Sequence, residues 1–147
     1  MSEINYDDFA ENFNLQLNNH LVKVSRIKDI DKLFNKLLSK PAADVNVLDE
    51  RMPYWADLWP SAIGLSEYID ENPFLVREKN VVEIGCGLGM PGIVAALNGA
   101  NVTMTDYLQE ALDFSQNNWM KNLSIKFNGQ LLDWRDVSKI EKTDVIL

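Results

Sequence analysis

Hydrophobic and polar positions follow two different periods in the first part of the chain. Ser2 stands where a helix N-cap is expected, and apolar residues then recur at roughly helical spacing, at Ile4, Tyr6, Phe9, Phe13 and Leu17. Residues 21–27 (LVKVSRI) instead alternate, which is typical of a half-buried strand. Asp29 opens a second helical pattern that Pro41 stops, with an apolar face made of Ile30, Leu33, Phe34, Leu37 and Leu38. The pattern predicts a helix, a strand and a helix in that order.

The rest of the chain alternates between apolar runs and helical patterns. After a polar, irregular stretch over residues 41–53, Pro60 stands in the first turn of a helix expected over about residues 60–71. The elements expected beyond it are a strand from Asn80, a helix ended by Gly99, a strand ended by Asp106, a helix over residues 108–122, a strand near residues 124–132 and a last strand at TDVIL, residues 143–147.

Strands that alternate with helices indicate an α/β fold with right-handed crossovers. We expect a Rossmann-like, doubly wound parallel sheet in the order 3-2-1-4, counted from the strand at Asn80, preceded by N-terminal helices. Residues 1–52 would form an N-terminal helical and strand extension, and residues 53–147 a nucleotide-binding domain. The ligand would lie at the carboxyl ends of the first two strands.

Composition narrows the class of protein. The 147 residues, 46% of them hydrophobic, are enough for one globular domain with its own core. No apolar run approaches the roughly 20 residues of a membrane helix, and the start MSEINYDDF is acidic where a secretory signal is basic. With a single cysteine and a net charge of −8, we expect a cytoplasmic protein without disulfides, membrane contact or nucleic-acid binding.

The segment NVVEIGCGLGMPG carries the candidate chemistry. Glycines let the backbone turn sharply off a strand and approach a bulky ligand, while the following helix offers free N–H groups. Gly87, Gly89 and Gly92 form a G-x-G-x-x-G, which alone favours a dinucleotide and an NAD-linked oxidoreductase. When the motif is read from the end of the strand, a second interpretation is Glu83-x-Gly85-x-Gly87-x-Gly89. Its carboxylate suits a ligand with a cationic amino-acid portion.

The carboxylates of this segment also have structural alternatives. Glu83 could pair with a lysine or cap a turn, although a carboxylate within an apolar strand is unfavourable unless something satisfies it. Asp106 ends the second strand, where a carboxylate accepts from ribose hydroxyls, but it could also cap the helix that begins near Leu108. Both roles of Asp106 can coexist.

The motif E-x-G-x-G-x-G with an acid at the end of the second strand resembles the class I S-adenosylmethionine-dependent methyltransferases. The segments PYWADLWPSAIGLSEYI and LLDW resemble the seven-β-strand protein-lysine methyltransferase group, which includes the electron-transfer-flavoprotein β-subunit lysine methyltransferase. Together these segments cover about residues 53–134. Residues 53–147 would then be a domain that binds S-adenosylmethionine.

The resemblance, taken with the position of Glu83, implies a set of cofactor contacts made by Trp59, Glu83, Gly85, Cys86, Gly87, Asp106, Asp133 and Trp134. The three loop residues contact the amino-acid part, Trp59 lines the pocket and Asp106 binds the ribose. Trp134 flanks the adenine, whose amine donates to Asp133. No catalytic residue and no metal ligand is assigned.

The implied reaction is transfer of a methyl group to the neutral amine of a protein lysine or of a small molecule. In that group, later strands supply much of the acceptor pocket, and we expect the chain to be incomplete after its fourth strand. The open sheet edge would favour self-association. A non-catalytic module that binds cofactor or assembles with a partner is the alternative function.

Other reactive or aromatic residues are interpreted as structural. Trp55 and Trp59 lie four residues apart, which would place them on one helical face, and Trp55 is expected to be packing. Trp119 is expected in the core. His20, the single histidine, is predicted to be a solvated surface residue, and Cys86 a small loop residue with little thiol reactivity.

Overall fold

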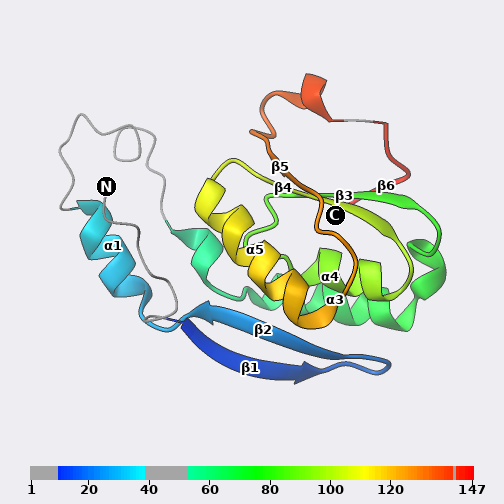
Figure 1. Ribbon diagram of the computed structural model, residues 1–147, viewed down its shortest axis with the longest axis horizontal. Helices are drawn as coiled ribbons and strands as arrows, with labels where there is room; N and C mark the ends of the chain where they lie inside the picture. Colours follow the sequence, from blue (N-terminus) through cyan, green and yellow to red (C-terminus); the bar gives the residue numbers. More distant parts are fainter. Residues whose placement is uncertain (1–9, 39–52, 141) are drawn as a thin grey trace.

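The computed structural model describes residues 10–38, 53–140 and 142–147 (Figure 1). Within these ranges, four parallel strands form a sheet in the order β5-β4-β3-β6. The strands are β3 (Asn80–Ile84), β4 (Asn101–Asp106), β5 (Gly129–Leu131) and β6 (Val145–Ile146). This order confirms the predicted 3-2-1-4 arrangement, with the third strand shorter than expected.

Three helices, α3 (Pro60–Glu71), α4 (Met90–Leu97) and α5 (Gln109–Asn122), lie on one side of the sheet (Figure 1). Helix α4 is apolar all around (MPGIVAAL), and its residues from Met90 to Ala96 are buried because it packs against α3, α5 and the sheet. Trp119 of α5 is 1% exposed, which confirms its predicted place in the core. The described residues also form the helical segments α1 (Ile30–Leu38), η2 (Tyr54–Ala56), η3 (Pro73–Leu75) and η4 (Val137–Lys139).

An antiparallel hairpin of β1 (Ala10–Gln16) and β2 (Leu21–Ile27) packs against α5. The strand β2 was predicted, but the helix expected to run through Phe13 and Leu17 is wrong in the described residues. Phe13 and Leu17 fit both periods, and with Leu15 they form an alternating pattern whose side chains face the molecule. Ser2, Ile4, Tyr6, Phe9 and Pro41, which also entered these predictions, lie outside the described residues.

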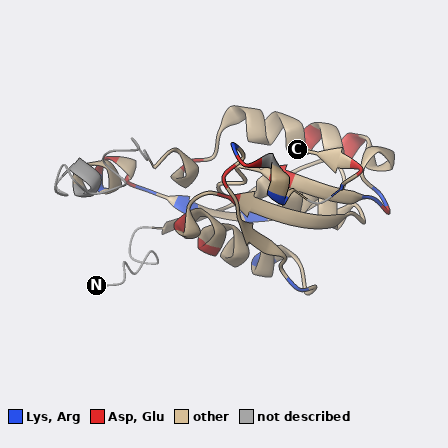
Figure 2. Cartoon of the chain, turned by 90° about the horizontal axis from the view of Figure 1, so that it is seen from above, with Lys and Arg blue, Asp and Glu red and all other residues tan. Residues whose placement is uncertain are grey.

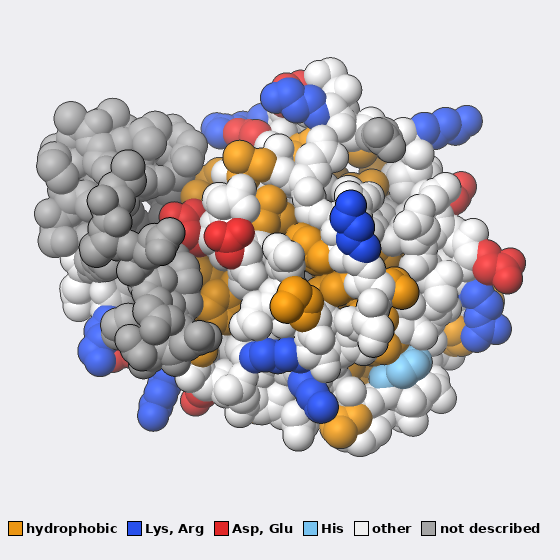
Figure 3. Space-filling model, viewed as in Figure 1, with side chains coloured by type: hydrophobic (Ala, Val, Ile, Leu, Met, Phe, Trp, Pro, Cys, Tyr) orange, Lys and Arg blue, Asp and Glu red, His pale blue; other side chains and the backbone are white. Residues whose placement is uncertain are grey.

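The turn of this hairpin is fixed to the end of α3. The fully buried Asp70 accepts hydrogen bonds from the Asn19 backbone N–H (2.7 Å), and its other oxygen lies 2.6 Å from Nδ1 of His20. His20 was predicted to be a solvated surface residue, and this holds for only part of its ring. Its ring is visible at the surface in Figure 3, yet one edge pairs with a buried carboxylate. A short-range pattern cannot reveal this contact, because the two residues are 50 positions apart.

Charges are dispersed over the described part of the chain. Figure 2 shows Lys and Arg interspersed with Asp and Glu, without a continuous basic face in that view. None of the described helices is long and apolar enough to cross a membrane. No cluster of three or more potential metal ligands from His, Cys, Asp and Glu occurs among the same residues.

Candidate functional site

The loop between β3 and α4 is built on glycine. Gly85, Gly87 and Gly89 have φ values of 64°, 51° and 77°, in the left-handed region that side chains rarely adopt. A Cβ on Gly89 would lie 2.9 Å from Cβ of Ser115 on α5, so the loop also needs glycine for close packing. A Cβ on Gly85 would meet no protein atom within 4 Å, and Gly85 lines the adjoining cavity.

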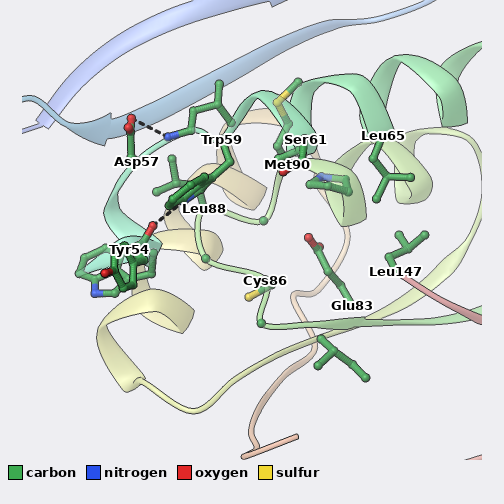
Figure 4. A pocket seen from close by; sticks show the side chains of 18 of the residues that line it. Tyr54, Asp57, Trp59, Ser61, Leu65, Glu83, Cys86, Leu88, Met90 and Leu147 are labelled. Atoms are coloured by element: carbon green, nitrogen blue, oxygen red, sulfur yellow. Dashed lines mark hydrogen bonds between the residues drawn. The ribbon is translucent and has the colours of Figure 1, made fainter. Parts of the chain in front are cut away.

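This cavity has a volume of about 440 Å³ and lies at the carboxyl end of β3 (Figure 4). Its walls come from the end of β3, the glycine loop, the start of α4, the residues that follow β4, and the segment from η2 into α3. The location is the crevice where open α/β sheets bind their ligands. Four of the predicted site residues lie in the strand end and the loop, namely Glu83, Gly85, Cys86 and Gly87.

Glu83 lies in the cavity wall and is only 5% exposed. Its Oε2 accepts a hydrogen bond from the Gly92 N–H of α4 at 2.9 Å. The pKa of Glu83 is raised to about 8, mainly by burial and further by the Asp106 charge, against the lowering effect of the Gly92 N–H. The side chain is thus a buried acid that a neighbouring cation would ionise.

Asp106 is 4% exposed and braces the loop from the end of β4. One carboxylate oxygen accepts from the Gly87 N–H (3.1 Å), and the other accepts from the Leu108 N–H (3.0 Å) at the entry to α5. The structural alternative predicted Asp106 as the cap of this helix, but the N-cap residue is Leu108, and Asp106 instead braces the turn before it. Asp106 does not itself line the cavity, whereas the next residues, Tyr107 and Leu108, do.

Cys86 is buried in the same loop and has a free thiol. Burial raises the pKa of this thiol well above its ordinary value, and the nearby acidic side chains of Glu83 and Asp106 add to the effect. The thiol therefore stays protonated at neutral pH, as expected for a loop residue with little reactivity.

The two tryptophans ahead of α3 do not share a helical face as predicted. Trp55 belongs to η2, whereas Trp59 immediately precedes α3, which begins at Pro60. The ring of Trp55 packs on Phe114 with centroids 5.6 Å apart, while Trp59 is 50% exposed and donates from Nε1 to the Tyr54 carbonyl. Both residues line the cavity.

Asp133 and Trp134 follow β5 at the carboxyl end of the sheet, where Asp106 ends β4. The Leu132 N–H donates to the Asp106 carbonyl at 2.8 Å, which brings the two strand ends together. Trp134 is 60% exposed, and Asp133 pairs with Arg135. Neither of the two residues lines the cavity.

Several residues that line the cavity were not predicted: Tyr54, Asp57, Leu65 and Tyr107. Tyr54 stacks edge-on against Trp59 at a centroid distance of 6.1 Å, and Asp57 pairs with Arg26 at 3.3 Å. Tyr54 and Asp57 stand within the segment that carries the two tryptophans, so the motif itself was the available signal.

Comparison with known proteins places this geometry in a family context. A family model described as "Lysine methyltransferase" matches residues 49–147. The "Protein N-terminal and lysine N-methyltransferase efm7" of Schizosaccharomyces pombe is 53% identical over 60 residues, which cover 40% of this chain and 24% of that protein. The "Histone-arginine methyltransferase METTL23" of Rattus norvegicus is 36% identical over 121 residues, 73% of this chain and 53% of that protein. The chain therefore spans about half or less of the length of these relatives.

A solved structure supports the fold. The chain resembles the 16S rRNA N2 G1207 methyltransferase of T. Thermophilus, solved with AdoMet and guanosine, with a TM-score of 0.62. The likeness covers 94% of this chain and 32% of that one, at 16% sequence identity.

Proposed function

The chain belongs to the lysine methyltransferase family, and we propose that it binds S-adenosylmethionine in the cavity described above for methyl transfer to a protein lysine. One observation carries this proposal: the E-x-G-x-G-x-G segment folds into a cavity wall in which the buried Glu83 adjoins the glycine loop. A dinucleotide would bring a pyrophosphate toward this carboxyl, which is unfavourable, whereas a cationic amino group suits it.

Each predicted contact has a physical role in this proposal. Glu83 meets the amino group of the cofactor, and the backbone of Gly85, Cys86 and Gly87 follows its amino-acid part. Asp106 uses the lone pairs left by its two backbone hydrogen bonds to accept from the ribose hydroxyls. Trp59 closes the cavity on the side of α3.

The bound cofactor supplies a methyl group on a positively charged sulfur. The protein then has to hold that group in line with an uncharged amine and to keep water out. Tyr54, Asp57 and Trp59 form a partly exposed rim of the cavity where an approaching lysine would meet aromatic faces and a carboxylate. The net charge of −8 also favours a basic partner.

The adenine contact of Asp133 and Trp134 is a separate part of the proposal. Both residues lie beside the end of β4 without lining the cavity, so they contact adenine where it extends beyond that space. Replacing Trp134 by Ala should weaken S-adenosylhomocysteine binding by ~1–3 kcal/mol if the indole stacks on the base. Met120→Ala is the control, because Met120 is a similarly exposed apolar residue on α5.

Calorimetric titration with S-adenosylhomocysteine, with NAD as the competing ligand, tests the cofactor. Saturable binding of S-adenosylhomocysteine alone is the expected result, and preference for NAD would overturn the proposal. Transfer of labelled methyl from S-adenosylmethionine to lysine peptides, with small amines in parallel, then tests the reaction. Binding without transfer to either acceptor would instead identify a cofactor-binding module.

Two finer proposals concern the setting of the chain. A cytoplasmic location is supported by Cys86, the single cysteine, which is buried with a free thiol. Self-association through β6 is supported by its place at the edge of the sheet and by Ile146, which is 58% exposed. Sedimentation equilibrium over a tenfold range of concentration tests the second proposal, and a constant monomer mass would exclude it.

A further inference from the structure

Two asparagines on α5, Asn118 and Asn122, bind the outer edge of β2. The Asn122 side chain accepts from the Lys23 N–H (2.8 Å) and donates to the Lys23 carbonyl (2.7 Å). Asn118 binds Ser25 in the same way. It accepts a hydrogen bond from the Ser25 N–H at 2.8 Å and donates one to the Ser25 carbonyl at 3.1 Å. Each side-chain amide thus makes the two hydrogen bonds that a residue of a neighbouring strand would otherwise make.

The spacing of the two elements makes this arrangement possible. In an antiparallel pair, alternate residues turn both backbone polar groups away from the partner strand. In β2 these residues are Lys23 and Ser25, whose backbone N–H and carbonyl groups point away from β1 and toward α5. Asn118 and Asn122 are one helical turn apart, which matches the two-residue step of the strand. The helix therefore completes the hydrogen bonding of an otherwise open edge.

Asn118 makes one contact that Asn122 does not make. Its side-chain nitrogen also donates to the carbonyl of Leu88 at 3.1 Å, whereas the nitrogen of Asn122 donates to the Asn118 carbonyl at 2.8 Å. Asn118 is 0% exposed, so these polar groups have no access to water. Leu88 lies in the glycine loop and lines the cavity.

The contact at Leu88 constrains the orientation of a peptide plane. The carbonyl of Leu88 and the N–H of Gly89 belong to one planar unit, and the Gly89 N–H donates to the Cys86 carbonyl at 2.7 Å. With both ends of this unit anchored, Gly89 is held at its φ of 77° immediately before α4 begins. Loss of either anchor would let the plane rotate and change the cavity wall.

We infer that Asn118 is a positioning residue that joins the β1–β2 hairpin to the glycine loop and thereby sets the affinity of the cavity for S-adenosylmethionine. The inference rests on the proposed function. It makes the hairpin, whose residues precede the part of the chain matched by the family model, a structural component of the cofactor site.

The test compares Asn118→Ala with Asn122→Ala in titrations with S-adenosylhomocysteine. Both variants remove a pair of hydrogen bonds to β2, so both should lower the midpoint of denaturant unfolding. Only Asn118→Ala also frees the Leu88 carbonyl. The dissociation constant of this variant for S-adenosylhomocysteine should rise about tenfold, the effect of losing one buried hydrogen bond. Asn122→Ala should bind within about twofold of the unchanged chain.

Equal affinity of the two variants would overturn the inference, whereas lack of binding by the unchanged chain would overturn the proposed function instead. Asn118→Asp provides a second variant, because Asp retains the acceptor for the Ser25 N–H but cannot donate to Leu88 when ionised; it should also bind more weakly. If both variants fail to fold, hydrogen exchange in the unchanged chain decides. S-adenosylhomocysteine should slow exchange at the Asn118 side-chain amide more than at that of Asn122, and an equal response would contradict the coupling.

Discussion

A loop can need glycine for its backbone conformation or for the space that a side chain would fill, and both reasons apply to Gly85. Its φ of 64° disfavours a side chain, a Cβ would lie in open space, and the residue lines the cavity. Gly85→Ala should therefore cost about 1–2 kcal/mol of stability and also obstruct the proposed cofactor. Gly99 is the matched control, because its φ is 90° and its Cβ would make only an ordinary contact with Arg77. Gly99→Ala should lose similar stability and keep full affinity for S-adenosylhomocysteine, measured by calorimetry.

The titration of Glu83 makes a second prediction for a single residue. Its pKa is about 8 in the folded chain, because burial disfavours the charged form, whereas the ordinary pKa of a Glu is 4.5. Between these values the folded state keeps a proton that the unfolded state has lost, so stability falls as the pH rises through this range. The Gln side chain of Glu83→Gln cannot ionise, so this variant should not show the loss of stability with rising pH. The complete loss is on the order of several kcal/mol.

Denaturant unfolding of both proteins at pH 5.5 and pH 8.5 measures the effect of Glu83. The stability of Glu83→Gln relative to the unchanged chain should increase with pH, and the increase should level off above about pH 8. The amide oxygen of Gln can still accept from the Gly92 N–H, which isolates the effect of charge. A difference that does not depend on pH would show that Glu83 is ionised in the folded chain.

The sequence located part of this site because part of it is local. Glu83 and Gly85 are two residues apart, and the strand-turn-helix pattern fixes their arrangement. The bonds of Asp106 to Gly87 and of Asn118 to Leu88 join residues 19 and 30 positions apart, and no short-range period predicts such pairs. Tyr54 and Asp57 belonged to a recognised motif, but their place on the cavity follows from the packing of η2 beside the loop.

At the level of elements, most strands and helices after Pro60 were predictable because they have a strong period and a clear end, whereas β5 is shorter than the pattern predicted. The hairpin was half predicted. β2 alternates over seven residues, whereas the β1 residues also fit a helix, and only pairing with β2 decides between the two. A strand whose partner is unknown has a weaker signal than a helix, since its hydrogen bonds are not local.

The attachment of the hairpin to α3 is an element-scale interaction that can be tested. Burial alone would raise the pKa of Asp70, but hydrogen bonds from the Asn19 N–H, His20 and Asn98 outweigh it and hold the pKa below its ordinary value. Such a group stabilises the fold above the pKa of the unfolded state, and this contribution is lost as the pH falls through the folded value.

Asp70→Asn should therefore lower the free energy of unfolding at pH 7 by ~1–3 kcal/mol, through the loss of charge-assisted hydrogen bonds to the hairpin turn. Glu71→Gln is the matched control. Glu71 accepts a hydrogen bond from Asn18 of the same turn, but it is exposed, and its replacement should change stability by less than about 0.5 kcal/mol. Equal losses in the two variants would show that the hydrogen bonds of Asp70 contribute no more than the exposed one of Glu71.

For the molecule as a whole, the elements converge on one cavity. The glycine loop, α5 through Asn118 and β4 through Asp106 all fix its wall, and the hairpin is joined to the same loop through Asn118. A ligand that binds only this assembled state must stabilise the entire fold, because the wall does not exist in the unfolded chain.

This linkage predicts the thermal behaviour of the whole chain. S-adenosylhomocysteine at one hundred times its dissociation constant should add ~2.7 kcal/mol to the folded state. For a domain of this size the unfolding midpoint should rise by about 5–10 °C. NAD at the same concentration should leave the midpoint unchanged, and calorimetric scans with each ligand measure both effects. If S-adenosylhomocysteine binds without raising the midpoint, the ligand must also bind the unfolded chain, and the cavity formed by the folded elements cannot be its site.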